Sequence, residues 1–404
     1  MLKCLSLILL PVVSFALCLP ALCQTDSPAS PQTAPAQSPP AEAPPAAPSV
    51  WSVGPIDFSG LLDGYYSYNA NHPASEANQL RNFDLEANQF SLNMAKLSLS
   101  HTPDPIGFQV DFGFGRAFDL IHSSEKAPEI FRYLEQVYVS VKPKEAKGLE
   151  VDFGEFVTSA GAEVIETNNN WNYSRSLLFS YAIPYYHFGL RASMPVTKNF
   201  TAGFQVANGW NNVEDNNSGK TIGVTGTYTR SKFSWSNTYY VGPEKSDTNK
   251  GNRNLYDTVL LLTPSDKLNA YLNFDYGQER RIFAGIDRWI GFAAAVRYAP
   301  TKWFSLTPRA EYYYDATGFT TGTPQKLREV TMTGEFKMAD GFLSRLEYRR
   351  DHSNVPFFER GQTPNASQIS SPLQMFPSLH EVPAGAVGFE QVPVAWSQVP
   401  RRWH

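Results

Sequence analysis

Beyond residue 23 the sequence contains no cysteine, because its three cysteines are Cys4, Cys18 and Cys23. Residues 24–404 therefore cannot form a disulfide framework, a thiolate zinc site or a cysteine nucleophile. The absence of cysteine also suits a chain that crosses an oxidising periplasm in an unfolded state.

Long apolar runs are also missing after residue 23, and a transmembrane helix needs ~20 apolar residues in succession. The mean hydropathy is −0.32, although aromatic residues make up 14% of the chain. This composition fits a soluble protein or a transmembrane β-barrel, because the alternating strands of a barrel disappear in hydropathy averages. The formal net charge is −4, and no basic stretch suggests that the chain binds nucleic acid.

Motifs that carry catalysis or hold a cofactor are absent or weak. The seven histidines show no HExxH or paired-ligand spacing, and no GxSxG-like nucleophile context occurs. The glycines of 113–115 lie inside an expected strand, which argues against a phosphate loop. The polar run 211–217 lacks the spacing of a calcium loop. We therefore expect no enzymatic activity, no catalytic residue, no cofactor and no metal site.

Residues 1–23 have the features of a cleaved signal peptide. Lys3 supplies a positive start, Leu5–Leu22 form a short apolar run, and Ala21 and Cys23 are small residues at −3 and −1 of a cleavage point. These features predict export from the cytoplasm.

Residues 24–49 form a Pro/Ala-rich linker with eight prolines between Pro28 and Pro48. Nothing in this composition could build a core. We expect a disordered periplasmic linker, and docking to the cell wall is an alternative without support in the sequence.

From Ile56 to about His352 apolar and polar residues alternate with the period of β-strands. In the segment 268–277 the even-numbered residues are apolar, whereas Asn269, Asn273 and Asp275 lie on the other face. Short connections such as 265–266 and 301–302 take turns with longer polar ones such as 243–252 and 315–325. Outer-membrane barrels have this asymmetry, with tight turns on the periplasmic side and long loops outside.

A soluble β-sandwich would alternate as well, but its filled core would not tolerate charges on the second face. The apolar faces often end in aromatic residues such as Tyr276, Tyr298 and Trp303, as in a lipid-facing band with aromatic girdles. We predict an all-β fold, a transmembrane antiparallel up-and-down β-barrel of about 16 strands in the bacterial outer membrane.

Fifteen strands can be counted up to His352, and a single-chain barrel needs an even number. We therefore expect a barrel over residues 50–352 and an irregular tail over 353–404 that is interrupted by prolines. The best candidate for a closing strand in this tail is Ala386–Val392. The alternative is an aberrant tail produced by a frameshift or truncation, because an unpaired edge in lipid is costly.

The chain resembles the OmpL-like β-barrel porins of Gram-negative bacteria over roughly Ile56–Gln368. The stretches that carry the resemblance are Phe153–Phe156, Gly161–Glu163, Asn172–Ser176, Pro184–Arg191, Asn208–Asn211 and Glu347–Asp351. The resemblance implies an outer-membrane porin and assigns no solute. Proteins of this family usually finish on an alternating strand with a terminal aromatic residue, and this tail departs from that pattern.

The longest connection, residues 159–184, is too apolar for an exposed tip, because it contains two tyrosines, a tryptophan, a phenylalanine and two leucines between residues 171 and 181. We expect it to fold into the lumen and narrow it, with Glu163, Glu166 and Arg175 near the constriction. An ordered lid on the extracellular rim is the alternative.

Strand parity assigns further charged residues to the lumen face. These candidates are His187, Arg191, Asp275, Arg309, Glu311, Glu335, Lys337, Arg345, Glu347 and Arg349. Their mixed signs predict weak charge selectivity. As an alternative, they form cross-strand pairs that brace the inner wall.

Barrels of ~16 strands leave an aqueous channel, so we expect passive diffusion of small hydrophilic solutes. A plugged outer-membrane barrel that acts as a surface adhesin or scaffold is the second hypothesis, and an outer-membrane hydrolase is the third. The expected partners are outer-membrane lipid, small hydrophilic solutes and the outer-membrane assembly machinery. A homotrimer follows only by analogy.

Overall fold

The computed structural model describes residues 52–126, 128–339 and 341–377. The expected signal peptide, the expected linker and the segment Ala386–Val392 all lie outside these residues. Within the described ranges, no helix is long and apolar enough to cross a membrane.

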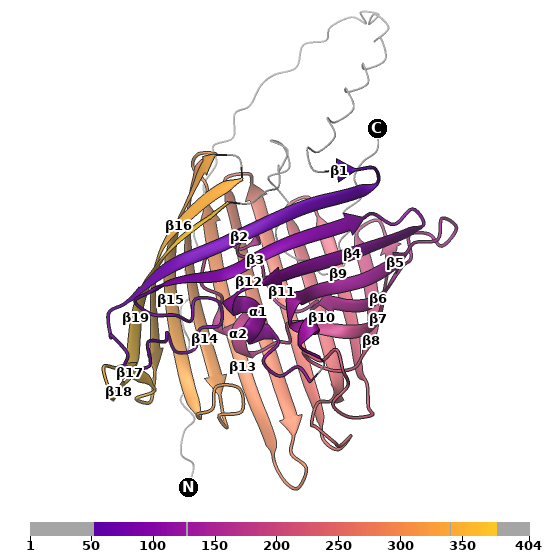
Figure 1. The fold of residues 1–404 in the computed structure, drawn as a ribbon. Coiled ribbons are helices and arrows are strands. Elements are labelled where there is room, and N and C mark those ends of the chain that lie inside the picture. Colours follow the sequence, from indigo (N-terminus) through magenta and orange to yellow (C-terminus); the bar gives the residue numbers. More distant parts are fainter. Residues whose placement is uncertain (1–51, 127, 340, 378–404) are drawn as a thin grey trace, which may run out of the picture. The chain divides into compact units, whose positions relative to one another are not determined.

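Sixteen antiparallel strands form one sheet that closes on itself, which confirms the predicted barrel (Figure 1). Neighbours in sequence pair with each other, and the last strand pairs with the first. The strands are β2 (Ile56–Asn69), β3 (Phe90–His101), β4 (Ile106–Phe114), β5 (Leu134–Val141), β6 (Glu150–Val157), β7 (Tyr186–Thr197), β8 (Phe200–Ala207), β9 (Thr221–Arg230), β10 (Phe233–Pro243), β11 (Asn252–Ser265), β12 (Leu268–Arg280), β13 (Ile286–Tyr298), β14 (Phe304–Asp315), β15 (Gln325–Ala339), β16 (Phe342–Ser353) and β19 (Ser367–Pro377).

Smaller elements lie between or beside these strands. They are β1 (Ser52–Val53), which pairs with β2, the hairpin of β17 (Phe358–Arg360) and β18 (Thr363–Asn365), the helices α1 (Arg116–Ile121) and α2 (Leu177–Tyr181), and the 3-10 turns η1 (Glu129–Tyr133) and η2 (Thr167–Asn169). Figure 1 shows β1 and the β17–β18 hairpin at opposite ends of the barrel.

The connections alternate in length as expected. We call the end with the short connections, such as 231–232 and 266–267, the turn end. The other end carries the long connections, such as 70–89, 115–133 and 158–185, and we call it the loop end.

The closing strand differs from the prediction. It is β19, so the barrel continues to Pro377 instead of ending at residue 352, and the expectation of an irregular tail is wrong for residues 367–377. Pro372 hides this strand in the sequence, because a proline has no N–H to donate to the ladder. Accordingly, the ladder with β16 is interrupted between the pairs Leu346–Leu373 and Arg349–Ser370. The hydroxyl of Ser371 donates to the carbonyl oxygen of Glu347 at 2.8 Å inside this gap.

The two faces of the sheet have opposite polarity. On β12–β16 the exposed face carries apolar residues such as Leu272, Val296 and Val330, whereas the buried face carries polar and charged residues. Because the sheet is closed, the buried face is the inner one. This arrangement is the reverse of a soluble barrel and is typical of a barrel in lipid.

The interior also contains an apolar core. Long connections contribute side chains to it, among them Phe83, Phe118, Phe179 and Val213, and inner-wall residues such as Trp289 complete it. The interior of the barrel is therefore filled by inward-folded connections as well as by wall residues.

Candidate functional site

The segment 158–185 has a built conformation of its own, which begins with local capping and turn contacts. The hydroxyl of Ser176 accepts a hydrogen bond from the N–H of Phe179 at 3.0 Å and caps the N-terminus of α2. The side chain of Asn170 accepts from the N–H of Val164 at 3.0 Å and donates to the carbonyl oxygens of Val164 and Glu166 at 2.8 Å. These contacts fix the turn that contains η2.

Charged residues of β16 bind the backbone of this segment. The carboxylate of Glu347 accepts hydrogen bonds from the N–H groups of Tyr173 at 2.8 Å and Ser174 at 3.1 Å. Arg345 donates to the carbonyl oxygens of Thr167 at 2.7 Å and Asn170 at 2.5 Å. Hydrogen bonds to ionised groups are roughly twice as strong as neutral ones, so β16 holds the segment firmly.

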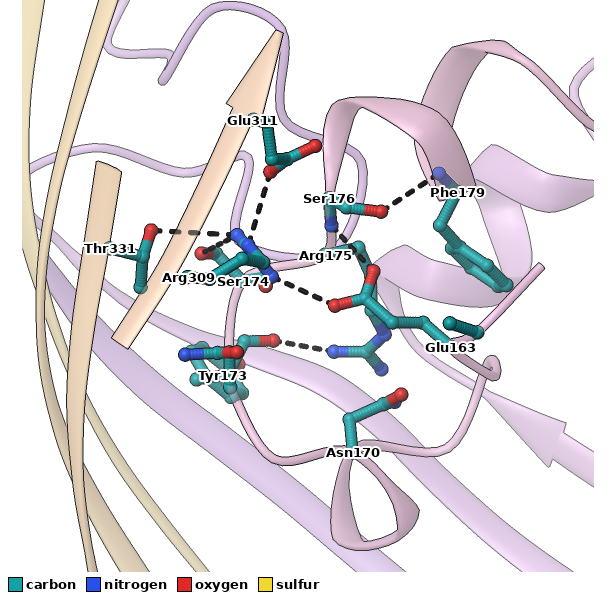
Figure 2. Close-up of polar contacts among 12 residues, drawn as sticks. Glu163, Asn170, Tyr173, Ser174, Arg175, Ser176, Phe179, Arg309, Glu311 and Thr331 are labelled. Carbon is teal, nitrogen blue, oxygen red and sulfur yellow. Dashed lines mark hydrogen bonds and ion pairs between the residues drawn. The ribbon is translucent and has the colours of Figure 1, made fainter. Parts of the chain in front are cut away.

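Arg309 of β14 lies at the centre of a second set of contacts (Figure 2). Its guanidinium is 2.8 Å from Glu163 Oε1 and 3.1 Å from Glu311 Oε1, and it donates to the carbonyl oxygen of Ser174 at 2.7 Å. The two carboxylates hold the segment in turn, because Glu163 accepts from the N–H of Ser176 at 2.6 Å and Glu311 accepts from that of Leu177 at 2.7 Å.

Strands β10, β12 and β13 bind the two ends of the segment. The hydroxyl oxygen of Tyr240 accepts from the N–H of Ser159 at 3.0 Å, and Asn273 Oδ1 accepts from that of Ala162 at 3.3 Å. The indole N–H of Trp289 donates to the carbonyl oxygen of Ala182 at 3.0 Å. Segment 158–185, which follows β6 and precedes β7, thus contacts the buried faces of β10 and β12–β16.

The three residues expected at a constriction have different surroundings. Glu163 is buried beside Arg309, whereas Glu166 retains some exposure and pairs with Lys96. Arg175 is buried, and its guanidinium donates to the carbonyl oxygens of Val164 at 2.8 Å and of Ile165 and Tyr173 at 2.5 Å. Burial lowers the pKa of Arg175. Glu163 and Arg175 thus hold the segment together, and Glu166 alone of the three contacts the β3 wall.

Most of the charged residues assigned to the lumen face by parity are buried in ion pairs. Besides the contacts of Arg309 and Arg345 given above, Arg345 pairs with Glu335 at 2.6 Å and Arg349 with Asp351 at 2.8 Å. Arg191 pairs with Asp152 at 2.7 Å.

The remaining lumen candidates are His187, Asp275 and Lys337. His187 Nδ1 is 2.8 Å from the carbonyl oxygen of Gly209, and Asp275 lies opposite Asp257 in the β11–β12 ladder; both are buried. Lys337 is exposed near the turn end. Lys337 is therefore the one lumen candidate among the described residues that is not buried.

A ring of inaccessible side chains runs around the interior. Each of the sixteen strands contributes at least one residue that is no more than 1% exposed. These residues are Ser67, Asn93, Asp111, Glu135, Glu155, His187, Gln205, Thr221, Tyr240, Leu255, Asp275, Trp289, Tyr313, Leu327, Arg349 and Ser370. Water would reach some of these side chains if the lumen were wide open.

A charged cluster on β3–β5 was missed by sequence analysis. Lys96 Nζ is 3.1 Å from Asp111 Oδ2, 3.1 Å from Glu135 Oε2 and 2.5 Å from Glu166 Oε1. Asp111 pairs with Gln136 and Phe112 with Leu134, so Glu135 is the extra residue of a bulge in β5, and parity alone does not bring these residues together. Across the described ranges, no group of three or more His, Cys, Asp or Glu side chains could hold a metal ion.

Comparison with solved structures finds porins and other outer-membrane proteins. An anion-selective porin from Comamonas acidovorans matches with a TM-score of 0.57 at 11% identity, over 80% of this chain and 99% of that one. The outer-membrane channel DcaP of Acinetobacter baumannii matches with a TM-score of 0.56 at 9% identity, over 80% and 96%. OmpT, an outer-membrane protein of Vibrio cholerae, matches with a TM-score of 0.53 at 12% identity, over 80% and 97%. At these identities the likeness shows the fold alone.

No curated protein matches the chain. The model of one family does, however, match residues 55–375, which include nearly the whole barrel and its closing strand. The match supports an outer-membrane location and agrees with the polarity of the two faces of the sheet. The chain belongs to the family described as putative beta-barrel porin-2, OmpL-like.

Proposed function

We propose that this protein is an outer-membrane channel for the passive diffusion of small hydrophilic solutes, and that segment 158–185 narrows its lumen. The observation that carries the proposal is the set of contacts between this single segment and the inner faces of β10 and β12–β16. Contacts with the inner faces of six strands support a position of the segment inside the lumen. Charged groups on the inner faces suit a pathway that fills with water when it opens, because charges are costly in a dry core.

The lumen that we propose is narrower than the open, constricted channel that the sequence predicted. The ring of inaccessible residues, one or more on each strand, supports a lumen that is closed to water in this arrangement. Solute passage therefore requires the segment to move away from part of the wall. A channel of this kind would open rarely or conduct weakly until its segment is displaced.

Single-channel recording in planar bilayers tests the proposal. Replacing Asn168–Ser176 by a flexible Gly/Ser linker of the same length removes the Asn170 and Arg175 side chains that fix this backbone against Glu347. We expect a larger and more frequent current. The connection 316–324, which has the same length as the replaced stretch, provides the control, since its replacement changes no residue of segment 158–185. Unchanged conductance in the folded 168–176 variant would contradict the proposal.

A permanently plugged barrel that serves as a surface adhesin or scaffold is the second candidate. The apolar core inside the barrel favours it, because Phe83, Phe118, Phe179 and Val213 from four connections bury one another and the wall. This candidate predicts no current from the wild type and none from the replacement variant, provided that both are folded.

We also propose a homotrimer, with residues 24–49 as a periplasmic linker and with outer-membrane lipid and the assembly machinery as partners. Support for the trimer comes from a trimer form of OmpT of Vibrio cholerae, which matches this chain with a TM-score of 0.50 at 11% identity. The molar mass of the detergent complex, measured by light scattering, distinguishes a trimer from a monomer.

A further inference from the structure

Towards the turn end, some inner residues are more accessible on the β3–β9 wall than on the β14–β16 wall. Towards the turn end, the inner residues Ser98, Gln109, Tyr138, Thr201 and Thr225 of β3–β9 are half-buried. At a similar distance from the turns, inner residues of β14–β16 such as Ser305, Glu335 and Arg345 are buried. Ser140, Asp152 and Thr227 on the same wall are buried, so segment 158–185 packs closely against the β14–β16 wall and leaves space along only part of the β3–β9 wall.

A charged cluster lies at the edge of this space, and two of its residues, Asp111 and Glu135, belong to the ring of inaccessible side chains. Lys96, Asp111 and Glu135 belong to the walls of β3, β4 and β5, and Glu166 belongs to segment 158–185. One ammonium group thus faces three carboxylates. Glu135 is 1% exposed, and its Oε1 has no hydrogen-bond partner within the described residues. The cluster therefore has more acceptors for a cation than Lys96 satisfies.

The pair of Lys96 and Glu166 is a polar tie between the segment and this wall. On the opposite side, the residues that follow Glu166 are held by Arg345, which donates to the carbonyl oxygens of Thr167 and Asn170. If Lys96 lost its charge, three carboxylates would face one another without a counter-ion. Like charges repel, and the side chain free to move is that of Glu166, because Asp111 and Glu135 are fixed in the sheet.

We infer that the Lys96–Glu166 pair closes the pathway along the β3–β5 wall, and that Asp111, Glu135 and Glu166 make this pathway selective for cations when it opens. The inference rests on the proposed channel function and gives it a location and a solute class. The ammonium of Lys96 occupies the position that a permeating monovalent cation would take between these carboxylates. Rings of carboxylates at a narrow point favour cations in channels.

The test compares Lys96→Met with Lys96→Arg in planar bilayers under a KCl gradient. We expect Lys96→Met to increase the open-channel current, with a reversal potential shifted towards that of potassium, whereas Lys96→Arg keeps the wild-type behaviour. Adding Glu135→Gln to Lys96→Met should move the reversal potential back. Lys232→Met, which changes an exposed lysine in the β9–β10 turn, is the matched control and should change neither quantity.

Heat-modifiable gel mobility first establishes that each variant is folded. If folded Lys96→Met has the wild-type current, or gains current without a shift in reversal potential, the inference is wrong. If the Asn168–Ser176 replacement conducts while Lys96→Met does not, only the inference fails. If none of the folded proteins conducts, the proposed channel function fails as well.

Discussion

Glu347→Gln tests how segment 158–185 is held. The carboxylate of Glu347 accepts hydrogen bonds from the N–H groups of Tyr173 and Ser174 and from the hydroxyl of Thr333, at 2.6 to 3.1 Å, and it is 1% exposed. Glutamine keeps the volume, but it offers one acceptor oxygen in place of two and carries no charge. At least one buried N–H group then loses its partner.

Losing a charge-assisted bond and leaving a buried donor without a partner costs about 2–3 kcal/mol, which corresponds to a roughly 30- to 160-fold larger population of the displaced segment. Hydrogen exchange at Tyr173 and Ser174 measures this population directly, and the rate at both amides should rise by a similar factor. Open probability in bilayers should rise with it. Glu145→Gln, at an exposed position in the β5–β6 turn, is the control and should change neither. Unchanged exchange at both amides in folded Glu347→Gln would refute the reasoning.

Three further predictions concern the barrel. Gly277→Ala should lower the free energy of unfolding, measured in urea, by about 1–3 kcal/mol, because the added Cβ would lie 1.9 Å from the indole of Trp289. The comparison is Gly322→Ala, whose Cβ would lie in open space and whose positive φ adds some strain. Val330→Arg places a charge on the outer face, where it should cost up to about 2–4 kcal/mol and reduce the yield of folded barrel, whereas Lys337→Arg should have no effect. Burial raises the pKa of Glu244, so its charged form is disfavoured in the folded state, and the stability of the barrel should fall as the pH rises from the ordinary glutamate range through the raised pKa. A pH profile of stability that is flat, and that Glu244→Gln leaves unchanged, would contradict this.

The alternation of side chains predicted the long strands β11–β16 well, because each pairs with little irregularity and has one face in lipid. It did not predict β19, where Pro372 interrupts the pattern and the inner positions are Ser and Gln. Local sequence cannot show that such a segment gains its partners from β16 and β2, which are far away in the chain.

The candidate site was predictable in part. The apolar content of residues 171–181 indicated that the long connection is not an exposed tip, and parity on β14–β16 selected the residues that hold it, such as Arg309 and Glu347. The dense packing of the barrel interior was not predictable, since it depends on two other connections, which fold inwards and contribute Phe83 and Phe118. The Lys96 cluster was missed because bulges in β3 and β5, at Asn93 and Glu135, shift the parity of the first strands.

Thiol accessibility tests most directly whether segment 158–185 covers the inner wall, since residues 24–404 contain no cysteine that would react in the background. Thr331→Cys lies on the inner face of β15 at 3% exposure, and Val330→Cys lies beside it on the outer face. With a charged, membrane-impermeant thiol reagent, we expect Thr331→Cys to be unreactive in the otherwise wild-type barrel and reactive once Asn168–Ser176 is replaced by the flexible linker. Val330→Cys should stay unreactive in both. Rapid labelling of Thr331→Cys with the segment intact would contradict the account.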